Sequence, residues 1–266
     1  MIHHTIRMSR RDAANGGRIA SVSAYDVLVI AAGLFAGALA SIVGFGIGSL
    51  LTPVLAMELG TRLAVALVSI PHLIGTALRF ALIRGHVDRR VFVSFGLMSA
   101  AGGLTGALLH ARLGNPALSI VFGALLLFVA VSEFSGLARK IRFEGALAWT
   151  AGAVSGFLGG LVGNQGGIRS GALLGFHLHR DAFVATATAI GLVVDAARMP
   201  VYFATQGDAL LASWPLAALA TAAVVAGTLA GRRVLSRIPP QHFHRIVAGV
   251  LAVLGIVMVI AGVREG

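Results

Sequence analysis

Eight long apolar segments, separated by short polar stretches, constrain this chain more than any other feature. Most are about 20 residues long, which lets an α-helix cross the roughly 30 Å hydrocarbon core of a bilayer. Hydrophobic residues make up 57% of the 266 residues and charged residues only 12%. The sequence therefore predicts an all-α polytopic membrane protein. With approximate boundaries, the segments are Val27–Met57, Leu63–Ile83, Val91–His110, Ala117–Phe134, Gly145–Phe176, Ala182–Phe203, Leu210–Ala230 and Phe243–Val263.

The first and fifth segments are each interrupted by a glycine-rich stretch. The breaks are Gly44–Ser49 and the longer, more polar Gly163–Gly171. Non-helical backbone at membrane depth is stable only where it is buried in protein or lines a wet cavity. In transporters such breaks supply free amides and half-helix ends that bind ions. We therefore expect both segments to be broken or re-entrant, and packed kinks with internally satisfied amides are the alternative.

The order of the segments indicates an internal duplication. A shift of 119 residues places Gly44 on Gly163, Gly48 on Gly167 and Arg79 on Arg198, and shifts of 125 and 126 align the later glycines. Glycines at G-x-x-x-G spacing, which let helix backbones approach closely, recur at 33/37, 152/156, 102/106 and 227/231. We predict a polar tail at 1–25, a four-segment repeat at 26–134, a charged linker at 135–144 and a second four-segment repeat at 145–263.

Charge and composition exclude several other classes. The net charge of +11 lies mostly in short loops between the segments, where basic residues orient a membrane protein. We therefore expect a lipid bilayer and no nucleic acid as partner. The chain has no Cys, which excludes disulfides and thiolate chemistry. The pairs His177/His179 and His242/His244 are interpreted as solvated interfacial residues, so we expect no metal and no cofactor.

The two breaks and their flanks resemble the sulfite exporter TauE/SafE family of integral membrane transporters. The resemblance covers about residues 26–262 and rests on GFGIGSLLTPVLAMELGTRLAVA, LVGNQGGIRSGALLGFHLHRDAFVATA and the basic loop RGHVDRR. Family members usually carry a G-x-G-G-G-like run at each break, where this chain has GFGIG and GNQGG. The resemblance implies export of a small anion such as sulfite or an organosulfonate.

Two topologies are compatible with the segments. If the first and fifth segments both cross the membrane, the halves are parallel repeats; if each is a hairpin, the halves are inverted. Loop Lys and Arg residues divide 11 against 7 in either case. Without the N-terminal tail the division is 7 against 7 for crossing segments and 11 against 3 for hairpins. We favour inverted repeats with cytoplasmic loops at 84–90 and 231–245.

Polar residues of the second and sixth segments fall on one helical stripe. In the second segment they are Ser69, His72, Thr76 and Arg79, and the counterparts of the last two are Asp195 and Arg198. Ionisable residues inside a membrane usually face the bundle interior or a wet cavity, and paired arginines suit an oxyanion. The alternatives are snorkelling for Arg79, a structural ion pair between Asp195 and Arg198, and a structural hydrogen bond for His72. Asp195 is also a candidate coupling residue.

The breaks supply the remaining candidates for the substrate site. Their backbone amides and polar side chains would face an anion path between the halves, although Arg169 is equally compatible with the membrane surface. The predicted substrate-binding residues are Gly44, Gly46, Gly48, His72, Thr76, Arg79, Asn164, Gln165, Gly166, Gly167, Arg169 and Arg198.

These features predict a secondary transporter of a small anion in a cell membrane, by analogy the bacterial inner membrane. The alternatives are a carrier of another anion, such as a carboxylate, and a non-transporting scaffold or sensor. The sequence is also compatible with a homo-oligomer. An enzyme is not expected, because the segments contain neither a Ser/His pair nor an H-E-x-x-H motif.

Overall fold

The computed structural model describes residues 23–135, 146–164, 166–176, 178–235 and 240–266. Every regular element in these ranges is a helix. In chain order they are α1 (Ala24–Val43), α2 (Ile47–Ile83), the 3₁₀ turn η2 (Arg84–His86), α3 (Arg89–Val91), the π-helical stretch η3 (Phe92–Gly96), α4 (Leu97–His110), α5 (Asn115–Ser135), α7 (Ala146–Val162), α8 (Gly166–Leu174), α9 (Arg180–Ala212), α10 (Trp214–Leu235) and α11 (Pro240–Glu265).

Helix length and composition confirm the predicted all-α polytopic membrane fold. In the described ranges, seven helices are long and apolar enough to cross a membrane, and Ala146–Val162 is a shorter apolar helix. Large apolar side chains such as Leu97, Val131 and Val253 are exposed on the outside of the bundle, as contact with lipid tails requires.

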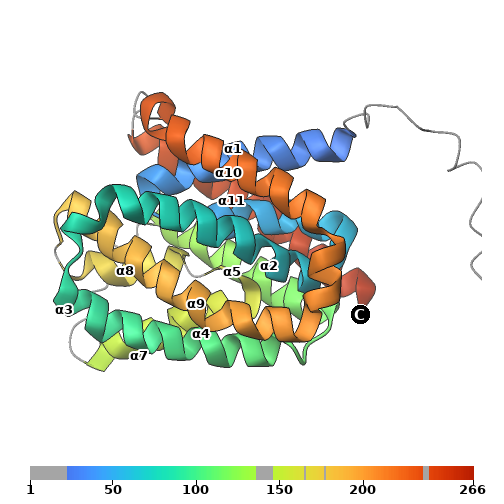
Figure 1. The fold of residues 1–266 in the computed structure, drawn as a ribbon, viewed down its shortest axis with the longest axis horizontal. Coiled ribbons are helices and arrows are strands. Elements are labelled where there is room, and N and C mark those ends of the chain that lie inside the picture. The colour runs from blue at the N-terminus through green and yellow to red at the C-terminus, as the bar shows by residue number, and fades with distance from the viewer. Residues whose placement is uncertain (1–22, 136–145, 165, 177, 236–239) are drawn as a thin grey trace, which may run out of the picture.

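Three pairs of helices surround a central pair (Figure 1). α1 packs against α10, α4 against α7 and α5 against α11, and α2 packs against α9 between them. The G-x-x-x-G glycines lie at two of these contacts. A Cβ at Gly37 would collide with the backbone of α10, and one at Gly106 with that of α7. Glycine is required here because the two backbones touch.

The predicted duplication converts one of these helix pairs into another. The shift of 119 relates α1 to α7, and the shift of 125 relates α4 to α10, so the pair α1/α10 exchanges with the pair α7/α4. A two-fold arrangement of duplicated halves would give this exchange. The division of the chain into repeats nevertheless stays a prediction.

Both broken segments return to the end at which they start. The Tyr25 hydroxyl donates to the Leu55 carbonyl at 3.4 Å, which joins the start of α1 to the returning arm of α2. At the opposite end of α2, the amide of Asp88 donates to Thr186 of α9 at 2.9 Å. α7 starts at this second end too, with Gly152 packed on Phe95 of η3, and the returning helix α8 places Leu173 in the same apolar cluster as Phe95. The packing therefore has the form of two hairpins that enter from opposite ends.

The breaks are shorter than predicted. α1 ends at Val43 and α2 begins at Ile47, so Ile47, Gly48 and Ser49 are helical. The second break ends before Gly166, and the residues from there to Leu174 form α8. Among the glycines at the described break positions, Gly44 (φ 85°), Gly46 (φ 129°) and Gly163 (φ 74°) have left-handed φ values, which glycine adopts without steric cost. Phe45 and Asn164 also lie between the helices, and the remaining described residues of the predicted breaks are helical.

Candidate functional site

The centre of the bundle is a buried polar cluster between α2 and α9. His72 Nδ1 lies 2.7 Å from Asp195 Oδ2, and Arg79 Nε donates to Thr188 Oγ1 at 2.9 Å. The numbers rise along α2 as they fall along α9, so the two helices are antiparallel. This contact brings the predicted polar stripes of both helices together.

Asp195 is shared by two basic side chains. Besides His72, it accepts from Arg198 Nε at 3.0 Å through Oδ1. Arg198 Nη2 lies 2.8 Å from the same oxygen, which is an ion-pair distance, but its alignment is too poor for a hydrogen bond. One donor of Arg198 is therefore held near a carboxylate without being satisfied by it. The predicted Asp195–Arg198 ion pair is present.

Arg79 and Arg198 bind the broken helices in the same way. Arg79 Nη1 donates to the Ala40 carbonyl and Arg198 Nη1 to the Gly159 carbonyl, each at 2.6 Å. The two carbonyls are also related by the shift of 119 residues. Each lies in the last turn before a break, where the helix end carries partial negative charge. The arginines thus fasten both hairpins to the central helices.

Arg169 completes the cluster from α8. It is buried, with 1% of its surface exposed, and Nη2 donates to the Gly44 carbonyl of the other break at 3.2 Å. Nε and Nη1 have no hydrogen-bond partner. A Cβ placed on Gly191 would lie 3.1 Å from Nη1, so the guanidinium points toward α9. Arg169 therefore faces the bundle interior and not the membrane surface.

The cluster has more positive charge than its protein partners balance. Arg79, Arg169 and Arg198 are buried together with one carboxylate, Asp195. Unpaired buried charge and unmade hydrogen bonds are costly. The unsatisfied buried polar atoms around the cluster are Thr52 Oγ1, Thr76 Oγ1, Asn164 Nδ2, Ser170 Oγ and the donors of Arg169 and Arg198 described above. A small oxyanion would accept from several of these donors and offset the excess charge.

The two breaks touch each other beside the cluster. Gly48 packs against the Gly163 carbonyl, and a Cβ on Gly163 would lie 3.6 Å from Arg198 Nη1. Gly166 packs on the Phe45 side chain, Gly46 on Leu39 and Gly167 on Val129 of α5. The structure therefore places Gly46, Gly166 and Gly167 against apolar side chains. Gln165, also a predicted site residue, lies outside the described residues.

The structure excludes one alternative that the sequence left open and adds a residue that sequence reasoning missed. Arg79 does not snorkel, because its guanidinium is buried and hydrogen-bonded inside the bundle. Tyr202 is not among the predicted site residues, but it is buried beside the cluster, and its hydroxyl donates to the Gly160 carbonyl. The Arg198 guanidinium lies 5.8 Å from its ring centroid. Spacing offered a signal for Tyr202, since it follows Arg198 at i+4 on the polar stripe.

Comparison with known proteins identifies one family. Residues 29–258 match the family described as Sulfite exporter TauE/SafE. No curated protein and no solved structure matches the chain. The match covers both breaks and the three arginines of the cluster.

Proposed function

Because the chain belongs to the sulfite exporter TauE/SafE family, a family of membrane transporters of sulfite and related anions, we propose that it binds such an oxyanion among Arg79, Arg169 and Arg198. Sulfite and organosulfonates are the substrate class that this proposal names, with export as the direction. The proposal assigns no enzymatic activity.

The excess of buried guanidinium groups carries the proposal. Three arginines are buried with one carboxylate, which pairs with Arg198, and donors of Arg169 on α8 and of Arg198 on α9 lack a hydrogen-bond partner. Arginine presents planar, multidentate donors that match the oxygens of a sulfur oxyanion. An anion that accepted from both would join α8 to α9, so binding would be coupled to the packing of the hairpins.

Asp195 and His72 are the proposed coupling residues. They form the buried acid–base contact of the cluster, at 2.7 Å. A proton on this pair would weaken the hold of Asp195 on Arg198 and leave Arg198 freer to bind an anion. Proton uptake and anion binding would then favour each other, as reciprocal linkage requires.

The hairpin arrangement supports an orientation for this transport. Loop Lys and Arg residues then divide 11 against 3 outside the N-terminal tail, with the excess at the end that carries residues 84–90. We infer that this end faces the cytoplasm. The opposite end, with Arg62 and Arg112, faces outward.

Flux of radiolabelled sulfite into proteoliposomes tests the proposal. Arg169→Gln should lower flux by about tenfold or more, the effect of losing one charge-assisted hydrogen bond. Arg112→Gln, in the loop between α4 and α5, is a matched charge control and should transport normally. Competition by sulfate, taurine and acetate distinguishes sulfur oxyanions from carboxylates. Normal flux and unchanged affinity in Arg169→Gln would contradict the site, and absent flux with intact protein would favour a scaffold.

A further inference from the structure

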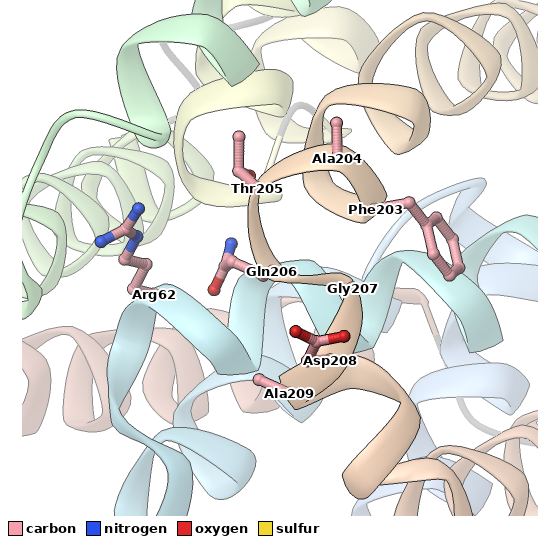
Figure 2. A pocket seen from close by; sticks show the side chains of 8 residues that line it. All are labelled: Arg62, Phe203, Ala204, Thr205, Gln206, Gly207, Asp208 and Ala209. Carbon is pink, nitrogen blue, oxygen red and sulfur yellow. The ribbon is translucent and has the colours of Figure 1, made fainter.

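A pocket of about 430 Å³ opens where α9 is interrupted, near its C-terminal end. Gln206 has a non-helical backbone here (φ −140°, ψ 18°). Arg62 lies across from it on α2, just after Gly60, whose φ of 71° interrupts that helix. Figure 2 shows Gln206 projecting from the break toward the side of Arg62, while Phe203 points the other way. The pocket thus lies between two interrupted helices at one end of the bundle.

Arg62 contributes a guanidinium group to this pocket, and only part of its hydrogen-bonding capacity is used within the protein. Its Nη2 donates to the Ala111 carbonyl at 2.7 Å, while its Nε is buried without a partner. Asp208 also lines the pocket. The negative charge of Asp208 would weaken the binding of an anion to Arg62. The pocket is therefore suited to transient binding during transport and not to a tight binding site.

A continuous series of contacts leads from the pocket to the buried cluster. Gln206 Nε2 lies 3.3 Å from His110 Nε2, and the His110 ring lies against the Tyr202 ring with centroids 5.0 Å apart. Tyr202 in turn lies under the Arg198 guanidinium. His110 is fully buried and its Nδ1 faces the Leu161 carbonyl at 2.8 Å, in the last turn of α7. The two rings, tilted at 59° to each other, therefore lie between the pocket and Arg198.

A second pocket at the same end has the opposite character. It is about 550 Å³ and is lined by Asp26 and Glu58 among mainly apolar residues. Its acids would repel an anion. Of these two pockets, the Arg62 pocket is therefore the one that is compatible with an anion.

We propose that the Arg62 pocket is the outer vestibule of the anion route, with Arg62 as the first or last contact of the anion and His110 and Tyr202 as the gate between it and the arginine cluster. This inference rests on the proposed function, since it assigns the route to the same site. For an anion to pass along this path, the rings of His110 and Tyr202 must separate when the outer end of the bundle opens.

Charge placed in the vestibule tests this route. The chain has no Cys, so Thr205→Cys, an exposed pocket position, gives a single thiol. Iodoacetate and iodoacetamide convert it to thioethers of nearly equal size, one anionic and one neutral, and neither is cleaved by sulfite. Ser213→Cys in the acidic pocket is the matched control, and unsubstituted protein treated with both reagents controls for reaction elsewhere.

The anionic adduct at Thr205→Cys should lower sulfite flux about threefold more than the neutral one, the Coulomb effect of one unit charge roughly 6 Å from the path in water. High salt should remove this difference. At Ser213→Cys both adducts should leave flux unchanged. Block by both adducts at Thr205→Cys would support the route by obstruction, whereas normal flux with both adducts would overturn it.

Arg62 provides an independent measurement. Arg62→Gln should raise the KM for sulfite about threefold with little change in maximal flux, and Arg62→Lys should restore it. Equilibrium binding of labelled sulfite in detergent should be the same in Arg62→Gln as in the parent protein, because the cluster is untouched. If Arg169→Gln also binds normally in that assay, the proposed function fails; if only the vestibule variants transport normally, the route alone fails.

Discussion

The contact between Asp195 and Arg198 predicts a strong energetic coupling between these two residues. Removing one partner of a buried ion pair costs about 3–5 kcal/mol, because a charge stays behind without compensation. Arg198→Gln should lie at the lower end, since Asp195 keeps His72 at 2.7 Å. Asp195→Asn should lie at the upper end, because it leaves three buried arginines with no carboxylate in the cluster.

The double substitution should cost less than the sum of the two single ones. With both residues neutral, Asn and Gln can hydrogen-bond to each other, and neither charge is stranded. We expect a coupling energy of about 2–3 kcal/mol, near the upper limit for residues in direct contact. For a chain of this length the single substitutions correspond to a fall in melting temperature of about 6–20 °C.

The free energy of unfolding of the purified protein in detergent, measured for the parent, the two single variants and the double variant, gives this coupling energy as a double-mutant cycle. The two tryptophans of the chain, Trp149 and Trp214, report the transition without any further label. The control cycle pairs Arg198→Gln with Arg264→Gln, near the end of α11, where the effects should add. If the effects at Asp195 and Arg198 also add to within about 0.5 kcal/mol, the ion pair does not stabilise the cluster and the charge argument is refuted.

Three further predictions concern packing around the site. Gly156→Ala should lower the melting temperature, because its Cβ would collide with the Ser99 carbonyl, whereas Gly249→Ala, which meets nothing within 4 Å, should leave it unchanged or raise it. Gly166→Ala should reduce the yield of folded protein in size-exclusion chromatography, because its Cβ would collide with Phe45, and adding Phe45→Gly should restore part of it. Tyr202→Phe removes the hydrogen bond to Gly160 and should cost about 1 kcal/mol in the same unfolding assay; no change would mean that the hydroxyl is equally well bonded in the unfolded state.

Periodicity and spacing predicted the parts of the fold that depend on one segment at a time. Apolar runs of membrane length predicted the helices, and the polar stripe correctly placed His72, Asp195 and Arg198 in the interior. The breaks were located correctly but drawn too long, since Gly166 to Leu174 is helical. Glycine content alone does not distinguish a glycine that unwinds a helix from one that packs against a neighbour, as Gly166 does against Phe45.

Contacts between distant segments could not be predicted from the sequence. Nothing near Arg169 in the chain shows that it reaches the Gly44 carbonyl, which lies 125 residues earlier. The same holds for His110, whose ring nitrogens face carbonyls of α7 and α2. A histidine at the end of an apolar run is normally solvated, and only the tertiary packing buries this one.

The asymmetry of the cluster bears on which arginine senses the substrate. If the halves are inverted repeats, an alternating-access motion exchanges their environments. Arg79 and Arg198 hold equivalent carbonyls at equal distances, so these bonds can persist in both states and would stabilise the hairpins throughout. The position equivalent to Arg169 in the first half is Leu50. The hydrogen bond from Arg169 to the Gly44 carbonyl therefore has no counterpart in the other half, and it would break when the two halves exchange environments. Arg169 is therefore the arginine whose donors change most, and a bound oxyanion would compensate for that loss.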